Sequence, residues 1–310
     1  MLAQARAGDR AAIARLLSLV EQGGDAAASV DAVVFPESGA ATTIGVTGSP
    51  GAGKSTLVSA LLAALRVRDH RVAVLAIDPS SPFSGGAILG DRVRMSDHAL
   101  DEGVFIRSMA TRGHLGGLAV ATPQAARVLD AVGYDQILVE TVGVGQVEVE
   151  VAGEADATVV VVNPGWGDAV QANKAGLMEV ADVFAVNKAD RPGVSETRRD
   201  LEQMLELSAP DRSGSDWRPP IVSTVATTSD GVVELWDAIE AAVGHLRAAG
   251  VLDERRRARL DAELQRVVTA RLAERAGALS TGSAYEEALT EVLGRRLAPW
   301  RAADRLLDAG

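Results

Sequence analysis

The feature that most constrains this chain is a glycine-rich stretch, Gly48-Ser49-Pro50-Gly51-Ala52-Gly53-Lys54-Ser55-Thr56. An apolar, strand-like run at 42–47 precedes it, and a helical pattern at 57–65 follows it. Glycine, four residues and then Gly-Lys-Ser, placed between a strand and a helix, is the pattern of a P-loop. The sequence therefore predicts a phosphate-binding loop, and the GxGxxG spacing of dinucleotide-binding folds is absent.

Each kind of residue in such a loop has its own task. Backbone N–H groups that the glycines leave accessible can surround phosphate oxygens, and the following helix adds the positive end of its dipole. We expect Lys54 to reach the β- and γ-phosphates and to serve hydrolysis, and the Ser55 hydroxyl to face Mg²⁺. All nine residues are predicted to contact the nucleotide.

Short apolar runs alternate with helical patterns along most of the chain. The predicted strands are 42–47, 71–77, 104–110, 136–140, 157–163, 183–187 and 221–225. Such an alternation predicts an α/β fold, a mostly parallel sheet with helices on both faces. Ligands of these sheets bind at the carboxyl ends of the strands.

Helical extensions are expected on both sides of this P-loop domain, which we assign to residues 41–250. In residues 1–40, Asp9 is predicted to cap a helix with a shared apolar face, made of Ile13, Leu16, Leu17 and Val20. In residues 251–310, two or three helices carry an apolar stripe that favours packing on the domain or on a second subunit. Arg255-Arg256-Arg257 is interpreted as a solvated helix face.

The motif Asn187-Lys188-Ala189-Asp190 ends the predicted strand at 183–187. The Asp190 carboxylate can accept hydrogen bonds from guanine N1–H and the 2-amino group, a pair of donors that adenine lacks. The Lys188 stem can lie over the base, and Asn187 can brace the loop. The motif favours GTP over ATP, and Thr224, Val225 and Ala226, around the end of the next predicted strand, are expected beside the same nucleotide.

Three acidic residues are candidates for the Mg²⁺ region: Asp78, Asp91 and Glu140. Asp78 and Glu140 end predicted strands, where carboxylates suit a hard cation, and the long Glu140 arm favours contact through water. Asp91 lies in a long inter-strand stretch. Asp78 could instead cap a turn before proline, and Asp91 could be an exposed loop acid.

Further candidates follow the strands at 136–140 and 157–163. The N–H of Gly143 could contact the γ-phosphate and sense hydrolysis. The sequence has no glutamine directly after Gly143 that would position water, so Gln146 and Lys174 are the candidates for that role. The stretch 163–174, with Trp166, suits a switch or a partner surface, although taken alone it fits a helix-capping loop better.

Composition excludes some function classes. The 310 residues carry a net charge of -11, which disfavours attraction to nucleic acid or to an anionic membrane. No apolar run is long enough to span a bilayer. The chain has no cysteine, which excludes disulfides and cysteine metal sites and is compatible with a cytoplasmic protein.

Taken together, the motifs resemble the G-protein chaperones of adenosylcobalamin-dependent acyl-CoA mutases, the MeaB/ArgK/MMAA type. The resemblance implies a GTPase of the SIMIBI class that binds GTP, GDP and Mg²⁺ and forms a homodimer through its C-terminal helices. Its implied partner is methylmalonyl-CoA mutase or a related mutase, whose cofactor loading it would gate and protect. The segments that carry the resemblance are 48–56, 78–82, 90–95, 112–117, 140–146, 164–174 and 187–190.

Two other classes stay open at this point. Metal-insertion GTPases for nickel enzymes usually need cysteine or histidine clusters, whereas this chain has no cysteine and 4 scattered histidines. An ATP-dependent kinase, which matches an old transport label of the family, is disfavoured by the guanine motif. Nucleotide preference would separate that kinase from a GTPase.

Overall fold

The computed structural model describes residues 1–78, 98, 100–110, 115–141, 153–165, 179–207 and 217–308. The chain divides into two compact units, Met1–Arg259 and Leu260–Gly310. The boundary falls inside one long helix, α11 (Val251–Leu279). The first unit holds the sheet, and the second holds the rest of α11 with α12 (Ser283–Leu293) and α13 (Pro299–Asp308).

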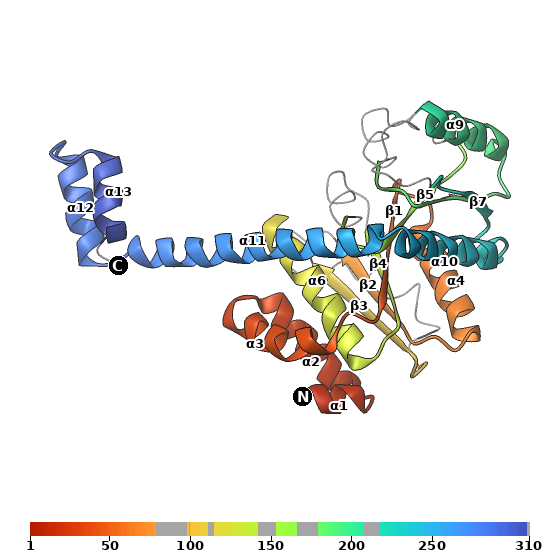
Figure 1. Cartoon of the computed structure of the whole chain (residues 1–310), viewed down its shortest axis with the longest axis horizontal. Coiled ribbons are helices and arrows are strands. Elements are labelled where there is room, and N and C mark those ends of the chain that lie inside the picture. Colours follow the sequence, from red (N-terminus) through yellow and green to blue (C-terminus); the bar gives the residue numbers. More distant parts are fainter. Residues whose placement is uncertain are drawn as a thin grey trace. The chain divides into compact units, whose positions relative to one another are not determined.

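Within the described part of the first unit, seven strands form one wholly parallel sheet (Figure 1). Their order is β3-β2-β4-β1-β5-β6-β7, which places β1 between β4 and β5. The predicted α/β class with a parallel sheet is therefore confirmed. The strands are β1 (Thr42–Gly48), β2 (Val72–Asp78), β3 (Val104–Ala110), β4 (Gln136–Thr141), β5 (Ala157–Val162), β6 (Val183–Asn187) and β7 (Ile221–Thr224).

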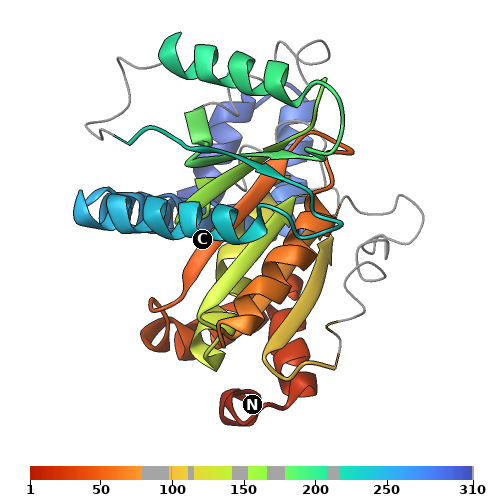
Figure 2. The ribbon, with the colours of Figure 1, turned by 90° about the vertical axis from the view of Figure 1, so that its right-hand side faces the viewer.

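Helices cover both faces of the sheet because the strands are apolar on both sides. On one face α4 (Lys54–Val67) and α10 (Val232–Ala248) bury a core that includes Ile44 and Leu138 (Figure 2). The alternate strand residues point to the other face, where α6 (Leu115–Val132) packs on β2, β3 and β4. On that same face α9 (Val194–Leu207) covers Phe184 of β6.

The N-terminal extension packs on α6 as part of the first unit. It consists of α1 (Leu2–Arg6), α2 (Arg10–Gln22), α3 (Gly24–Val34) and a 3-10 turn (Phe35–Glu37). The Asp9 carboxylate accepts hydrogen bonds from the N–H groups of Ala11 and Ala12, so the predicted cap is confirmed. The predicted apolar face is buried, namely Ile13, Leu16, Leu17 and Val20.

In the second unit, α12 and α13 contact each other, with Ala288 and Ala302 buried and an ion pair between Arg305 and Glu291. The α11 stripe is exposed in this chain, at Leu260, Leu264, Val268 and Leu272. None of the helices in the described ranges has both the length and the hydrophobicity that a membrane crossing needs.

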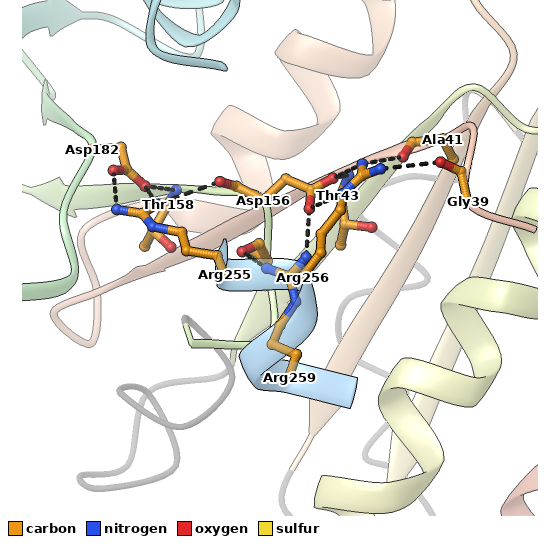
Figure 3. Close-up of polar contacts among 10 residues, drawn as sticks. Gly39, Ala41, Thr43, Asp156, Thr158, Asp182, Arg255, Arg256 and Arg259 are labelled. Carbon is orange, nitrogen blue, oxygen red and sulfur yellow. Dashed lines mark hydrogen bonds and ion pairs between the residues drawn. The ribbon is translucent and has the colours of Figure 1, made fainter. Parts of the chain in front are cut away.

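The first turns of α11 are tied to the sheet by three arginines (Figure 3). Arg256 and Arg259 pair with Asp156, at 2.6 and 2.5 Å, and Arg255 pairs with Asp182 at 3.0 Å. Both aspartate side chains are buried, with 2% and 4% exposure. The interpretation of this arginine run as a solvated face is therefore wrong for Arg255 and Arg256. Helical spacing could not reveal these pairs, because the acids lie 100 and 73 residues earlier in the chain.

The Asp156 pair makes stability depend on pH. Burial raises the pKa of Asp156, but the hydrogen bonds and charges of Arg256 and Arg259 outweigh burial and hold it below 3.8. A carboxyl with a lowered folded-state pKa stabilises the protein above its usual pKa, and this contribution is lost as the pH falls through the folded value.

We expect Asp156→Asn to lower the free energy of unfolding at pH 7 by about 2–4 kcal/mol, less than for a fully buried pair because Arg256 is partly exposed. Urea titrations of wild type and variant at several pH values measure the difference between them. That difference should stay constant above the usual pKa of 3.8 and shrink below it. A difference independent of pH would contradict the role of the charge.

Candidate nucleotide site

The predicted phosphate loop joins the end of β1 to the start of α4. At Gly48, φ is +132°, and an added Cβ would lie 2.0 Å from the carbonyl oxygen of Val161 on β5. At Gly53, φ is +90°, and an added Cβ would lie 2.6 Å from Nδ2 of Asn187. Both positions therefore need glycine for its backbone conformation and for the close approach of a neighbour.

Lys54 turns back over its own loop. Its Nζ donates to the carbonyl oxygens of Gly48, at 2.6 Å, and Ser49, at 3.2 Å, and the residue is only 7% exposed. The ammonium group therefore lies among polar loop atoms and not in the apolar core. A lysine held by carbonyl oxygens can exchange them for the stronger, charge-assisted bonds of a phosphate.

Ser55 and Glu140 meet at the carboxyl ends of the central strands. The Ser55 hydroxyl donates to Oε1 of Glu140 at 2.6 Å, and both residues are buried. Beside them the Thr141 hydroxyl donates to the Thr47 hydroxyl at 3.1 Å, because β1 and β4 pair in a register that aligns Val46 with Glu140. Two candidates separated by 85 residues in the chain thus share one hydrogen bond.

The predicted guanine motif lies against the phosphate loop. Nδ2 of Asn187 donates to the carbonyl oxygen of Ala52 at 2.8 Å. Nζ of Lys188, a residue with φ of +59°, donates to the carbonyl oxygen of Gly51 at 2.6 Å. Asp190 is exposed, so its carboxylate is accessible to a ligand. The end of β6 and the phosphate loop therefore form one continuous surface.

The end of β7 completes this surface through the same asparagine. Oδ1 of Asn187 accepts hydrogen bonds from the Thr224 hydroxyl at 3.2 Å and from the N–H of Ala226 at 3.1 Å. Val225 pairs with Asp230 in a short bridge that closes the turn. The three candidates at the end of β7 and just after it, Thr224 to Ala226, are thus adjacent to the guanine motif.

Three of the four Mg²⁺ candidates, Ser55, Asp78 and Glu140, lie within the residues that the structure describes. Among the described residues no group of three or more His, Cys, Asp or Glu could hold a metal ion. The oxygens of Ser55 and Glu140 are hard donors, which suit Mg²⁺. Asp78 ends β2 at the same edge of the sheet. Candidates that lie outside the described residues are Asp91, Gly143, Gln146, Trp166 and Lys174.

Two features of the site were not predicted. One is the hydroxyl pair of Thr47 and Thr141, for which the available signal was a threonine near the end of each of two apolar strands. The other is the backbone of Val161, against which Gly48 packs. Its contribution is a main-chain carbonyl, so no side-chain pattern could have indicated it.

A parallel sheet whose central strand leads through a glycine loop into a helix defines the P-loop nucleoside triphosphate hydrolases. The family described as methylmalonyl Co-A mutase-associated GTPase MeaB matches residues 13–281. This chain belongs to that family, and it is a GTP hydrolase that binds guanine nucleotide.

Individual proteins agree with this assignment. A Pyrococcus abyssi protein, provisionally named a GTPase, is 48% identical over 307 residues, which cover 99% of this chain and 95% of the relative. GTPase ArgK of Escherichia coli is 38% identical over 256 residues, which cover 80% of this chain and 77% of the relative. A solved structure described as a LAO/AO transport system kinase superposes with a TM-score of 0.72 at 29% identity. The match covers 99% of this chain and 95% of that structure's chain.

Proposed function

We propose that this GTPase is a nucleotide-dependent chaperone of an adenosylcobalamin-dependent acyl-CoA mutase, such as methylmalonyl-CoA mutase, and that it gates and protects cofactor loading. The observation that carries the proposal is the family match over residues 13–281, since the family is described as associated with that mutase. The contact between Asn187 and the phosphate loop supports a site that reads guanine and phosphate together.

In the proposed site, backbone N–H groups of the loop 48–56, other than at Pro50, and the ammonium of Lys54 bind the phosphates. Asp190 accepts two hydrogen bonds from guanine, Lys188 covers the base, and Asn187 with Thr224 to Ala226 supports the base-binding loop. Gly143 contacts the γ-phosphate, and Gln146 or Lys174 positions the attacking water. Each of these roles is part of the proposal.

We expect Asp190→Asn to weaken GDP binding by roughly two to four orders of magnitude, because two charge-assisted hydrogen bonds are lost. The amide can donate where xanthine presents a carbonyl, so the variant should prefer xanthine nucleotides. Calorimetric titration with GDP, XDP and ADP measures this, and Asp200→Asn on α9 is a control of equal charge change. If ADP bound the wild type as tightly as GDP, Asp190 would not be the residue that selects guanine.

Mg²⁺ fits the oxygen donors at the phosphate end of the site. Ser55, Asp78, Asp91 and Glu140 would hold it, in part through water molecules. When bound, the ion would neutralise charge on the transferring phosphate. The proposed role of Glu140 is supported by its buried carboxylate, which accepts the hydrogen bond from the Ser55 hydroxyl and so orients that oxygen.

Glu140→Gln should reduce GTP turnover by roughly 10–100-fold, the usual effect of losing a residue that orients a metal ligand. GDP affinity should change little, since Glu140 contacts Ser55 and not the base-binding loop. Single-turnover assays across a range of Mg²⁺ concentrations, with the exposed Glu234→Gln as control, measure this effect. Turnover and Mg²⁺ dependence like those of wild type would remove Glu140 from the site.

A GTPase acts as a switch only if its partner binds the GTP and GDP forms with different affinities. By the same linkage, the mutase must change nucleotide affinity. We further propose a homodimer formed through the C-terminal helices, supported by the exposed stripe from Leu260 to Leu272. The proposed location is the cytoplasm, with which the cysteine-free composition is compatible.

Size-exclusion chromatography with light scattering should show a mass of two chains for the protein alone. On addition of a cobalamin-dependent mutase from the same organism, it should show a complex whose amount differs between GDP and a non-hydrolysable GTP analogue. The mutase should also accelerate GTP hydrolysis. A monomer mass would contradict the dimer, and indifference to every candidate mutase would contradict the chaperone role while leaving the GTPase intact.

A further inference from the structure

Three adjacent strands carry the loops of the proposed nucleotide site. β1 ends in the phosphate loop, β6 ends in the guanine motif, and β5, between them, leads into Asn163-Pro164-Gly165. These loops contact one another, because Gly48 pairs with Val161 of β5 and Nδ2 of Asn187 donates to the carbonyl oxygen of Ala52 at 2.8 Å. A displacement of one of these strands along its axis would therefore also shift the loops that follow the other two strands.

At the opposite ends of these strands, two buried aspartates repeat one arrangement. Asp156 directly precedes β5; its N–H donates to the carbonyl of Thr43 at 2.7 Å, and its Oδ2 accepts from the N–H of Thr43 at 3.2 Å. Asp182 directly precedes β6 and makes the same two bonds with Thr158, both at 2.9 Å. Each aspartate thus locks the amino end of its strand to the neighbouring strand.

One segment of α11 holds both aspartates (Figure 3). Arg255 donates through two nitrogens to the two oxygens of Asp182, each at 3.0 Å, which is the bidentate geometry of a strong pair. Arg256 donates to both oxygens of Asp156 and also to the carbonyls of Gly39 and Ala41, just before β1. We name Arg255, Arg256, Arg259, Asp156 and Asp182 the arginine clamp.

We propose that the arginine clamp is a positioning element of the GTPase: it sets the axial position of β1, β5 and β6, and so couples the start of α11 to nucleotide binding at the other end of these strands. The proposal rests on the nucleotide site proposed above. The strands are short, 7, 6 and 5 residues, and buried apart from the first two residues of β1, so they can transmit a displacement with little bending. α11 itself continues past the clamp to Leu279.

Hydrogen exchange measured by mass spectrometry, with and without saturating Mg·GDP, tests this coupling in the full-length wild type. Ligand binding slows exchange throughout a protein by mass action, so the amides of α2, which packs on α6, serve as the reference. We expect amides in 49–56 to be protected by direct contact. We expect the exchange rate of amides in 251–259 to fall about fivefold more than that of the α2 amides. A factor of about five is the lower end of typical coupling between two sites.

A pair of variants separates positioning from plain stabilisation. Arg255→Gln breaks the pair with Asp182 but leaves Arg256 and Arg259 in place, whereas Arg257→Gln removes an exposed charge from the same turn. By reciprocity, Arg255→Gln should weaken GDP binding about fivefold and abolish the extra protection at 251–259, and Arg257→Gln should change neither. A purely structural clamp would lower the urea midpoint of Arg255→Gln and leave GDP affinity unchanged, which would overturn the proposal.

The wild-type measurement also separates a failure of the proposed coupling from a failure of the proposed nucleotide site. If GDP protects 49–56 but slows 251–259 no more than α2, the nucleotide site stands and the coupling is refuted. If GDP protects neither segment, the proposed site fails and the coupling fails with it.

Discussion

The side-chain amide of Asn187 is the interaction on which the rest of the nucleotide edge depends. It donates to Ala52 in the phosphate loop, and it accepts from Thr224, the last residue of β7, and from Ala226 just beyond. Because Asn187 is buried, each of these polar groups would lose its partner inside the protein if the amide moved, at a cost of about 1–3 kcal/mol per group. One residue therefore holds together loops that follow three different strands.

A second constraint acts at the amino ends of β5 and β6, where the buried side chains are charged carboxylates instead of apolar groups. Asp156 and Asp182 are almost completely shielded from water, and an unpaired carboxylate there would be strongly destabilising. The guanidinium groups of α11 satisfy them, so the helix has a defined starting point on the sheet. A buried ion pair often adds no more net stability than apolar packing would, whereas removing one of its partners is strongly destabilising.

The two constraints together give the sheet polar contacts at both ends and an apolar core between them. The core comes from continuous valine, isoleucine and leucine runs in the strands. The polar ends come from residues that stand just before or just after those runs, such as Asp156, Glu140 and Asn187. This arrangement is what allows a parallel sheet to place chemistry at one edge without weakening its interior.

The sequence by itself determined the fold class, the phosphate loop and the capped helix after Asp9, because these depend on local spacing: the period of apolar residues, the positions of glycines and one capping side chain. The family resemblance, confirmed by the comparisons, also needed only short motifs. Tertiary structure decided which distant residues meet. The pairing of Ser55 with Glu140 depends on the adjacency of β1 and β4, and the arginine clamp on contacts across 73 to 103 residues. Such contacts follow from strand order and register, which no local pattern of side chains records.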